Sequence, residues 1–331
     1  MKEIEYGLRG TSLGNMRILV TGGAGVIGSS LVRRIQGEIT VIDNLSSSST
    51  DSIKDLIEER RIRFVKGDVR NLPKLIELTR NVDLVVHLAA NGDVRYYPER
   101  RTDVDFQINT FGTYNVLEAM RRNDVPIIIY SSSSSVYGYA QKIPTPEAYG
   151  PLVPESLYAG SKLGGEGMVS SFAKMFGLSG RIFRFANIVG PSFRSVGRNV
   201  IPDLILKLRR NPKKLEILGN GLQEKSYLYV TDCIDGMFHL SDRSKEIVDI
   251  FNLGNVDSIS VNEIAKIIIE EMNLTNVDLN YTGGERGWIG DVPKTILDIS
   301  KAVNLGWSPG LNSKESVRKS AREIINQLPK V

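Results

Sequence analysis

Two side chains that could move a proton lie four residues apart in the segment SLYAGSKL, residues 156–163. If this segment is a helix, Tyr158 and Lys162 are separated by about 40° of rotation and share one face. A free tyrosine has a pKa of about 10, so the phenol needs about three units of lowering to act as a base near neutral pH. A lysine ammonium and a positively charged nicotinamide ring could supply that lowering together.

A run of five serines, residues 131–135, lies between an apolar segment and Val-Tyr-Gly. Serine runs are typical of flexible linkers. Because β-branched residues precede this run and a turn-forming glycine follows it, the pattern favours a strand that ends in serines. Their hydroxyls could then bond a substrate, a cofactor or backbone groups at the end of that strand.

A glycine-rich turn follows the first strand pattern of the chain. Gly22, Gly25 and Gly28 are spaced so that the backbone can turn tightly and approach a pyrophosphate at a helix N-terminus. Asp43 ends the next strand pattern, where its carboxylate would accept hydrogen bonds from an adenosine ribose. No arginine follows Asp43 at once to hold a 2′-phosphate, so the pattern predicts NAD rather than NADP. A glycine turn that serves packing alone is the alternative.

Apolar, β-branched segments alternate with helical patterns over the first part of the chain. Strands are expected at residues 16–20, 39–43, 61–69, 83–90, 126–132 and 179–187, and the longest helices at 108–122 and 157–176. Continuous apolar strands separated by helices are typical of a parallel sheet covered on both faces. The predicted fold class is α/β: a Rossmann-type doubly wound parallel sheet with a smaller α/β substrate domain.

After residue 187, glycine and proline interrupt the chain and the expected strands and helices become shorter. This change predicts two domains. We expect an NAD-binding Rossmann domain at 16–187, to which residues 226–254 return. A second domain is expected from residues 188–225 together with 255–331. Residues 1–15 are interpreted as an extension, without the apolar stretch of a signal peptide.

The overall composition argues against several classes of protein. The 331 residues carry a formal net charge of +4 without a block of five like charges, which argues against nucleic-acid binding. No run of about eighteen apolar residues occurs, so no transmembrane helix is expected. Cys233 is the single cysteine, which excludes an intrachain disulfide and favours a cytoplasmic location. With two histidines and one cysteine, no metal site is expected.

The sequence resembles the extended short-chain dehydrogenase/reductase superfamily. Within it, the chain is most similar to UDP-glucose 4-epimerase and related nucleotide-sugar enzymes of the NAD-dependent epimerase/dehydratase family. The motifs that carry the resemblance include TGGAGVIG, HLAA, SSSSSVYG, YAGSK and RFANIVGP. The resemblance implies that Tyr158 and Lys162 are catalytic, that Ser133 bonds the sugar 4-oxygen, and that NAD stays bound while a UDP-hexose is turned over.

The resemblance also implies two sets of binding residues. Those expected to bind NAD are Gly22, Gly25, Val26, Ile27, Gly28, Asp43, Asn44, Asp68, Val69, Leu88, Ala89, Ala90, Asn109, Ser131, Tyr158 and Lys162. Those expected to bind the nucleotide sugar are Ser133, Asn187, Asn199, Val200, Glu216, Leu218, Lys225, Tyr227 and Arg286. Relatives have an arginine where this chain has Trp288, so Arg286 could replace that phosphate anchor or the anchor could be missing. For each binding residue, a surface or packing role is the alternative.

The neighbours of Ser133 indicate the reaction. By resemblance, 4,6-dehydratases carry Asp-Glu at the positions of Ser134 and Ser135, and UDP-glucuronate decarboxylases usually carry Glu at the latter. A serine hydroxyl is a poor general acid at neutral pH. The sequence therefore predicts an isomerase that interconverts UDP-glucose and UDP-galactose through a 4-keto sugar. The alternatives are 4-epimerisation of UDP-N-acetylhexosamine or UDP-glucuronate, then UDP-glucuronate decarboxylation or dTDP-glucose 4,6-dehydration, then a non-catalytic NAD-binding scaffold.

Further expectations concern residues around this site. His87 is expected to be buried and hydrogen bonded rather than catalytic. Arg95, Tyr96 and Tyr97 could line the substrate entrance or form a solvated loop.

The Tyr158 helix carries more apolar residues than one sheet face can bury. This excess predicts a homodimer through the Asn109 and Tyr158 helices, with core packing as the alternative.

Overall fold

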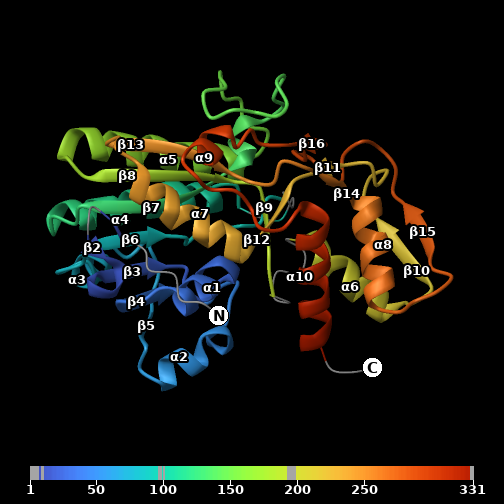
Figure 1. Ribbon diagram of the computed structural model, residues 1–331, viewed down its shortest axis with the longest axis horizontal. Helices are drawn as coiled ribbons and strands as arrows, with labels where there is room; N and C mark the ends of the chain where they lie inside the picture. Colours follow the sequence, from blue (N-terminus) through green and yellow to red (C-terminus); the bar gives the residue numbers. More distant parts are fainter. Residues whose placement is uncertain (1–6, 9–10, 96–98, 100, 192–198, 329–331) are drawn as a thin grey trace.

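The fold is built around a large parallel sheet. The computed structural model of the chain describes residues 7–8, 11–95, 99, 101–191 and 199–328. Seven strands pair in the order β13-β8-β7-β6-β3-β4-β5, all parallel (Figure 1). Their bounds are β3 Arg17–Thr21, β4 Glu38–Asp43, β5 Ile62–Lys66, β6 Leu84–His87, β7 Ile127–Ser133, β8 Ser179–Phe185 and β13 Val248–Leu253. The predicted α/β fold with a doubly wound parallel sheet is confirmed.

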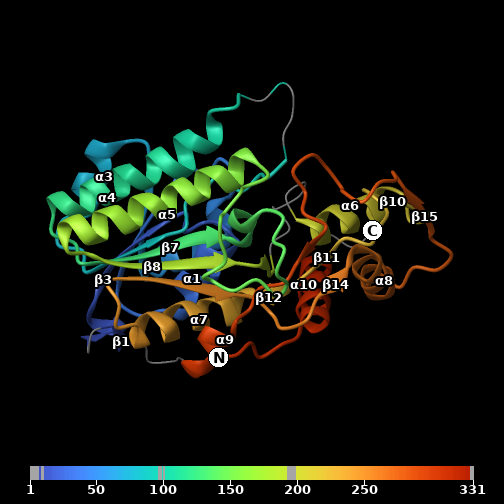
Figure 2. The same cartoon turned by 90° about the horizontal axis from the view of Figure 1, so that it is seen from above.

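The central strands are apolar on both faces because helices cover both. In β3, Ile18, Leu19 and Val20 are all buried. One face is covered by α1 (Val26–Arg34) and α7 (Val230–Arg243), as Figure 2 shows. The other is covered by α3 (Leu72–Leu78), α4 (Gly112–Arg122) and α5 (Leu157–Phe176). A π-helical turn at Phe106–Phe111 leads into α4, where the sequence predicted one continuous helix.

Strand order reverses between β3 and β6, which are neighbours in the sheet. Chain connections leave this point in opposite directions, so a crevice forms at the carboxyl ends of the strands. Ligands of doubly wound sheets bind in such a crevice. The glycine turn after β3 and the serine run at the end of β7 both lie at these carboxyl ends.

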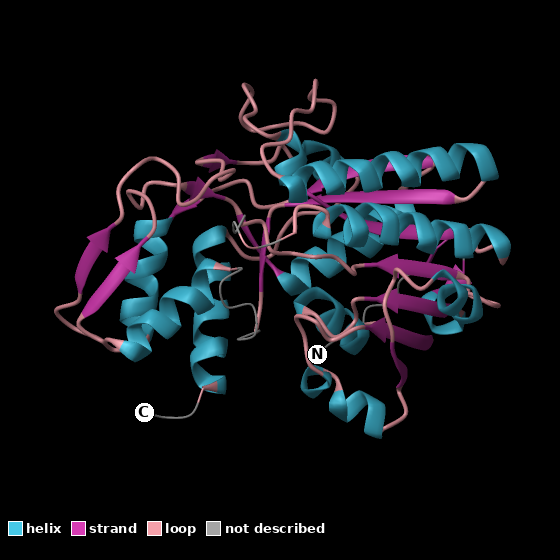
Figure 3. Cartoon of the chain, turned by 180° about the vertical axis from the view of Figure 1, so that it is seen from behind, coloured by secondary structure: helices cyan, strands magenta, loops and turns pink. Residues whose placement is uncertain are grey.

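A smaller group of elements lies beside the carboxyl ends of the large sheet (Figures 1 and 3). It contains three small sheets: β9 Asn187–Val189 with β12 Tyr227–Tyr229, β10 Lys214–Ile217 with β15 Asp278–Tyr281, and β11 Glu224–Lys225 with β14 Ile259–Ser260 and β16 Lys294–Thr295. Its long helices are α6 Val200–Arg210, α8 Val261–Glu271 and α10 Ser313–Gln327. Residues 226–254 contribute β13 to the large sheet, whereas their β12 pairs with β9 outside it.

The shorter elements complete the chain. They are β1 Gly7–Leu8, β2 Thr11–Ser12, α2 Lys54–Glu58 and α9 Ser300–Asn304. None of the helices among the described residues has the length and apolar character that crossing a bilayer requires.

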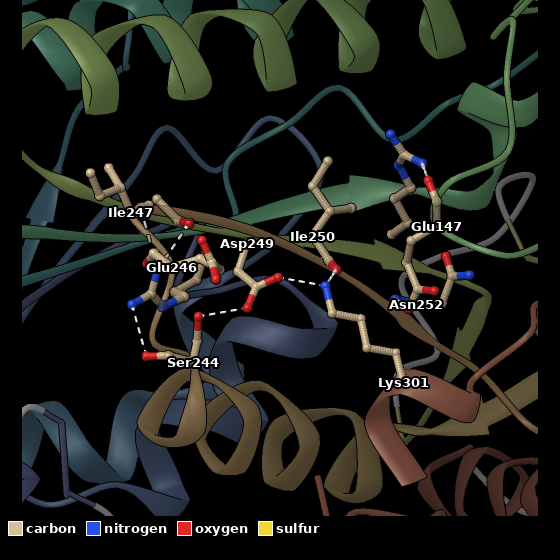
Figure 4. Close-up of polar contacts among 11 residues, drawn as sticks. Glu147, Ser244, Glu246, Ile247, Asp249, Ile250, Asn252 and Lys301 are labelled. Carbon is tan, nitrogen blue, oxygen red and sulfur yellow. Dashed lines mark hydrogen bonds and ion pairs between the residues drawn. The ribbon is translucent and has the colours of Figure 1, made fainter. Parts of the chain in front are cut away.

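The outer side of β13 is an edge that side chains cover (Figure 4). Lys301 on α9 donates 2.7 Å to the carbonyl of Ile250 and pairs with Asp249 at 2.5 Å. The carboxylate of Glu147 accepts a 2.9 Å hydrogen bond from the backbone amide of Asn252. Unpaired strand edges invite association with other strands, so these contacts protect the edge of the sheet.

Candidate functional site

The strand β7 and the helix α5 bring the three predicted catalytic residues together. Ser133 is the last residue of β7, and Tyr158 lies in the first turn of α5 with Lys162 one turn later. The helix begins there because the Ser156 hydroxyl caps it, accepting a 3.2 Å hydrogen bond from the amide of Ala159. Ser133 and Tyr158 line one cavity of about 410 Å³, which we call the substrate cavity.

Burial changes the protonation of both residues of the Tyr-Lys pair. It lowers the pKa of Lys162 to about 7, an effect that the nearby Glu166 carboxylate opposes. It raises the pKa of Tyr158 to about 12, partly offset by the Ser133 hydroxyl. The protein groups alone therefore keep the phenol protonated near neutral pH. A positive charge bound beside the phenol is needed to lower its pKa.

The serine run is a strand end followed by a 3₁₀ turn, which excludes the linker interpretation. Each of its first three hydroxyls has a defined contact. The Ser131 hydroxyl donates to the carbonyl of His87 (3.0 Å), that of Ser132 donates to Glu166 (2.5 Å), and that of Ser133 accepts from the amide of Ser135 (3.2 Å). The serines thus fasten β7 to β6, to α5 and to the following turn.

His87 is buried and hydrogen bonded, as the sequence predicted. Its ring nitrogens contact the hydroxyls of Thr21 at 2.6 Å and Thr113 at 3.0 Å. Burial, reinforced by the charge of Lys162, lowers the pKa of His87 to about 3. The imidazole is neutral at physiological pH and ties β3 to α4 beneath the site.

The glycine turn leaves no room for side chains. Gly22 has a φ of +71°, and a Cβ there would lie 2.7 Å from the amide nitrogen of Ala89. A Cβ on Gly28 would lie 2.4 Å from the carbonyl oxygen of Gly22. The carboxylate of Asp43 accepts hydrogen bonds from the amides of Ala24 (3.0 Å) and Leu45 (2.8 Å). A backbone cradle at the start of α1 therefore faces the crevice, as binding of a pyrophosphate requires.

A second cavity of about 660 Å³, the dinucleotide cavity, extends from this cradle to the catalytic pair. Of the residues predicted to bind NAD, its walls contain Gly25, Val26, Ile27, Leu88, Ala90, Ser131, Tyr158 and Lys162. Of the others, Gly22 and Gly28 belong to the tight turn itself, and the backbone of Ala89, after β6, lies against Gly22. Tyr158 lines both cavities, so a dinucleotide in one would meet a ligand in the other at its phenol.

The remaining predicted NAD residues are not among those that line this cavity; they are Asp43, Asn44, Asp68, Val69 and Asn109. Asn44 donates a 2.9 Å hydrogen bond to Asp68, whose pKa is lowered first by its contact with Arg70. Asn109 accepts from the amide of Asn91 at 2.8 Å. Val69 is buried in the core.

The sequence analysis missed the part of the dinucleotide cavity that follows Asp43. Ser47, Ser48 and Ser49 line it there, together with Arg33 of α1. The serine-rich segment directly after the β4 pattern was the available signal.

Six of the residues predicted to bind the nucleotide sugar line the substrate cavity with Ser133. They are Asn187, Asn199, Val200, Leu218, Lys225 and Tyr227. The other two, Glu216 and Arg286, do not line this cavity. Glu216 is exposed and pairs with Lys207 at 3.3 Å, and the exposed Arg286 lies 4.7 Å from the ring centroid of Tyr139. The strands β10 and β11 thus bring Leu218 and Lys225 to the catalytic residues without Glu216.

Comparison with known proteins identifies the family. Residues 18–254 match the NAD dependent epimerase/dehydratase family. The chain is 33% identical over 316 residues to a protein of Methanocaldococcus jannaschii provisionally named UDP-glucose 4-epimerase, covering 93% of this chain and 98% of that protein. The chain belongs to the NAD dependent epimerase/dehydratase family.

Solved structures of this family have the same fold. UDP-glucose 4-epimerase of Thermotoga maritima, solved with UDP-glucose, is 29% identical with a TM-score of 0.84, covering 95% of this chain and 100% of that one. UDP-glucuronic acid 4-epimerase of Bacillus cereus, solved with UDP-glucuronic acid and NAD, is 28% identical with a TM-score of 0.85 and the same coverage. Decarboxylases and dehydratases of nucleotide sugars are also relatives, so the family alone does not decide the reaction.

NAD is the cofactor of this family, and the residues of the dinucleotide cavity fit it. The backbone cradle of the glycine turn suits the pyrophosphate, since no side chain could occupy it. Lys162, Ser131 and Tyr158 line the same cavity.

Two further residues of the substrate cavity were not predicted as binding residues. Asp291 is buried and pairs with Lys225 at 2.5 Å. The ring centroid of Trp288 lies 5.1 Å from the Arg95 guanidinium and 5.2 Å from the Lys225 ammonium. The Gly-Asp that follows Trp288 was a signal for Asp291 in the sequence. Tyr96 and Tyr97, considered with Arg95, lie outside the described residues.

Proposed function

We propose that the protein is a UDP-hexose 4-epimerase that interconverts UDP-glucose and UDP-galactose. One observation carries the proposal. A single cavity is lined by Ser133 and Tyr158 and also by Leu218, Lys225 and Asn199, which are expected to bind the nucleotide part. Serine hydroxyls, rather than carboxylic acids, follow Ser133 at positions 134 and 135. Because hydroxyls are poor acids, oxidation and reduction at C4 are favoured over expulsion of water.

The chemistry of the protein's own groups follows from their positions. Tyr158 accepts the proton of the sugar 4-hydroxyl and later returns it, while Ser133 holds the 4-oxygen. NAD, when bound, supplies the acceptor for the C4 hydride and gives it back. Lys162 contributes positive charge at the Tyr158 phenol, which favours the phenolate.

Epimerisation requires firm binding of the nucleotide and loose binding of the hexose, because the hexose must present both faces. Lys225 and the amide of Val200 at the α6 N-terminus offer positive partners to a diphosphate. Binding energy placed there is remote from C4, so it can orient the sugar without fixing one of its faces.

A panel of UDP- and dTDP-sugars, followed by chromatography and mass analysis, tests the proposal. We expect UDP-galactose and UDP-glucose to interconvert without a change of mass. Loss of CO₂ would indicate a decarboxylase, and loss of water a dehydratase.

The variant Tyr158→Phe identifies the base. We expect turnover to fall by at least about 10²-fold, as for loss of a general base. The matched control is Tyr149→Phe, because the Tyr149 hydroxyl only accepts a 3.0 Å hydrogen bond from the amide of Gln141. Undiminished turnover in Tyr158→Phe would refute the assigned role.

A second candidate substrate is UDP-glucuronate, which carries a carboxylate at C5. Hydroxyl donors from Ser133 to Ser135 line the same cavity as Tyr158. Such donors suit a carboxylate, and the Bacillus cereus relative was solved with UDP-glucuronic acid. If UDP-glucuronate is the only sugar of the panel that gives an isomer, this alternative is selected.

A second copy of the chain is the proposed partner. Apolar side chains are exposed over the outer face of α4, α5 and the preceding π-helical turn. They are Phe106, Phe111, Tyr114, Met175 and Phe176, of which Met175 is 73% exposed. Figure 2 shows α4 and α5 side by side on this face. Exposed patches of this kind mark association surfaces, so a homodimer through these helices is proposed.

A further inference from the structure

A buried ion pair lies directly behind the catalytic residues. Glu166 on α5 and Arg184 on β8 form a two-point contact, with nitrogen–oxygen distances of 2.7 and 2.9 Å. Their side chains are only 6% and 4% exposed, respectively. Pairs this deeply buried cost desolvation energy and contribute little net stability compared with apolar residues of the same size. Stability alone therefore does not account for this pair.

Glu166 continues the row of catalytic residues on α5. Tyr158, Lys162 and Glu166 follow one another at intervals of four residues and share one helix face. The Glu166 carboxylate also accepts a 2.5 Å hydrogen bond from the Ser132 hydroxyl on β7. It thus connects the helix that carries the base to the strand that ends in Ser133.

The contact with Ser132 holds two neighbouring groups that the reaction uses. The carbonyl of Ser131 accepts a 2.7 Å hydrogen bond from Lys162. The hydroxyl of Ser133 lies in the substrate cavity. A shift of Ser132 along the strand would move both, so one carboxylate fixes the register of the strand end against the helix.

Arg184 is itself held from three sides and cannot follow Glu166. Its guanidinium donates 3.1 Å to the carbonyl of Glu147 and lies 4.7 Å from the ring centroid of Tyr137. The Glu147 carboxylate in turn contacts Asn252 on β13, where Figure 4 shows the two residues together. The Glu166–Arg184 pair is therefore held in place by the large sheet.

Charge adds a second effect. Glu166 is the protein group that raises the pKa of Lys162 against burial. Without it, the remaining charge of Arg184 would favour the neutral amine at Lys162.

We propose that Glu166 is a positioning residue: its contact with the Ser132 hydroxyl holds the Ser131–Ser133 strand end, whose Ser131 carbonyl accepts the Lys162 hydrogen bond, in register with Tyr158. The inference rests on the proposed function for its link to turnover. Its charge effect can be measured without any sugar nucleotide.

The first experiment measures the protonation of Lys162 directly. The protein is acetylated with acetic anhydride over a range of pH, and modification of Lys162 is followed by peptide mass spectrometry. In Glu166→Gln we expect the midpoint to fall by about one pH unit, since a close opposite charge shifts a pKa by about 1–3 units. In Glu166→Gln combined with Arg184→Met, both charges are gone and the midpoint should move part of the way back.

The second experiment separates positioning from electrostatics. Ser132→Ala removes the strand–helix contact and leaves the ion pair in place. We expect kcat to fall about tenfold, with KM for the sugar nucleotide and the midpoint for Lys162 unchanged; a tenfold loss corresponds to about 1.4 kcal/mol. If this hydrogen bond were merely structural, its loss would lower thermal stability but would not lower kcat at unchanged KM.

The matched control is Lys301→Met, which breaks the ion pair to Asp249 on the same sheet. This pair joins α9 to β13, and neither of its residues is among those that line the two cavities. Stability should fall, and the Lys162 midpoint and kcat should stay at their wild-type values.

An unchanged Lys162 midpoint in both Glu166 variants overturns the charge effect, and wild-type kcat in Ser132→Ala overturns the positioning effect. If Glu166→Gln fails to fold, the double variant and Ser132→Ala decide. The double variant removes the charge pair as a unit, a change that proteins often tolerate. Absence of turnover in the sugar panel would refute the proposed function and leave the acetylation result to judge the charge effect.

Discussion

The ammonium of Lys162 donates a hydrogen bond of 2.7 Å to the carbonyl oxygen of Ser131, joining α5 to the end of β7. Lys162 is 2% exposed, and burial lowers its pKa to about 7. The residue therefore changes charge near neutral pH, one helical turn after Tyr158.

Removal of this ammonium should abolish most activity. In Lys162→Met we expect kcat to fall by at least about 10²-fold, because the phenolate of Tyr158 loses its stabilising charge. Lys174→Met, on an exposed turn of the same helix, is the control and should retain wild-type kcat. Steady-state kinetics with the active sugar of the panel measures both. Equal activity in the two variants would show that Lys162 is not catalytic.

Turnover by the wild-type protein should decline above about pH 7. Lys162 is protonated below its folded pKa and loses its charge as the pH rises through that value. NAD and substrate alter the surroundings of the ammonium, so the limb measured in kcat can differ from the midpoint found by acetylation. A profile that keeps rising through pH 10 would contradict control by Lys162.

Neutral burial of His87 should make the protein less stable in acid. The unfolded chain binds a proton at this residue below about pH 6.5, whereas the folded protein does so only near pH 3. The contribution of His87 to the free energy of unfolding is therefore complete above pH 6.5. It falls as the pH decreases toward 3, by up to about 1.4 kcal/mol per pH unit. Urea unfolding over this range should show a shallower decline in His87→Gln. Parallel declines in the two proteins would contradict the assignment.

The fluorescence of Trp288 should report binding of the diphosphate. The chain has two tryptophans, and Trp307 is buried in the core. In Trp307→Phe, all tryptophan emission comes from Trp288, which lies near Arg95 and Lys225. Cation–π contacts contribute about 0.5–1 kcal/mol at such sites, less than the roughly 1.5–3 kcal/mol of hydrogen bonds to charged groups.

A bound diphosphate should therefore compete with the ring for Arg95, and with the ring and the Asp291 carboxylate for Lys225. We expect UDP to change the emission in proportion to the binding measured by calorimetry, and the change to shrink in Lys225→Ala. Binding of UDP without any change in emission would place the diphosphate away from Trp288.

If the protein is a homodimer through this apolar face, a charged substitution on the face should give a monomer. Phe176→Glu places a carboxylate in the exposed patch on α5, where burial against a partner would be costly. Light scattering should give the mass of a dimer for the wild type and of a monomer for the variant. The control is Val256→Glu, because Val256 is 72% exposed and lies far from α5 along the chain. A wild-type monomer would contradict the proposal.

The local sequence pattern was sufficient to predict the strand and the helix that carry the catalytic residues. The apolar run before the five serines has the length and β-branched content of a buried strand, and β7 ends at Ser133. Ser156 and the terminal glycine define α5 at both ends, so the register of Tyr158 and Lys162 could be predicted. The glycine turn likewise depends on local backbone geometry.

Binding residues on the smaller group of elements were less predictable. Leu218 and Lys225 lie on different segments, and their convergence depends on the pairing of β11 with β14 and β16. Glu216 is two residues from Leu218, and its exposed side chain instead pairs with Lys207. Such directions depend on contacts between distant segments, which a single sequence does not reveal.

The amino-acid sequence by itself determined the doubly wound sheet, through its alternating apolar strands and helices, and the dinucleotide turn, through its closely spaced glycines. The Tyr-Lys pair followed from helical spacing, and Ser133 from the resemblance to the family. Only the tertiary structure decided that Glu166 meets Ser132 and Arg184, since these come from three elements. It also decided which pKa values are shifted. Burial supplies the energy of those shifts, and burial arises only when separate segments pack together.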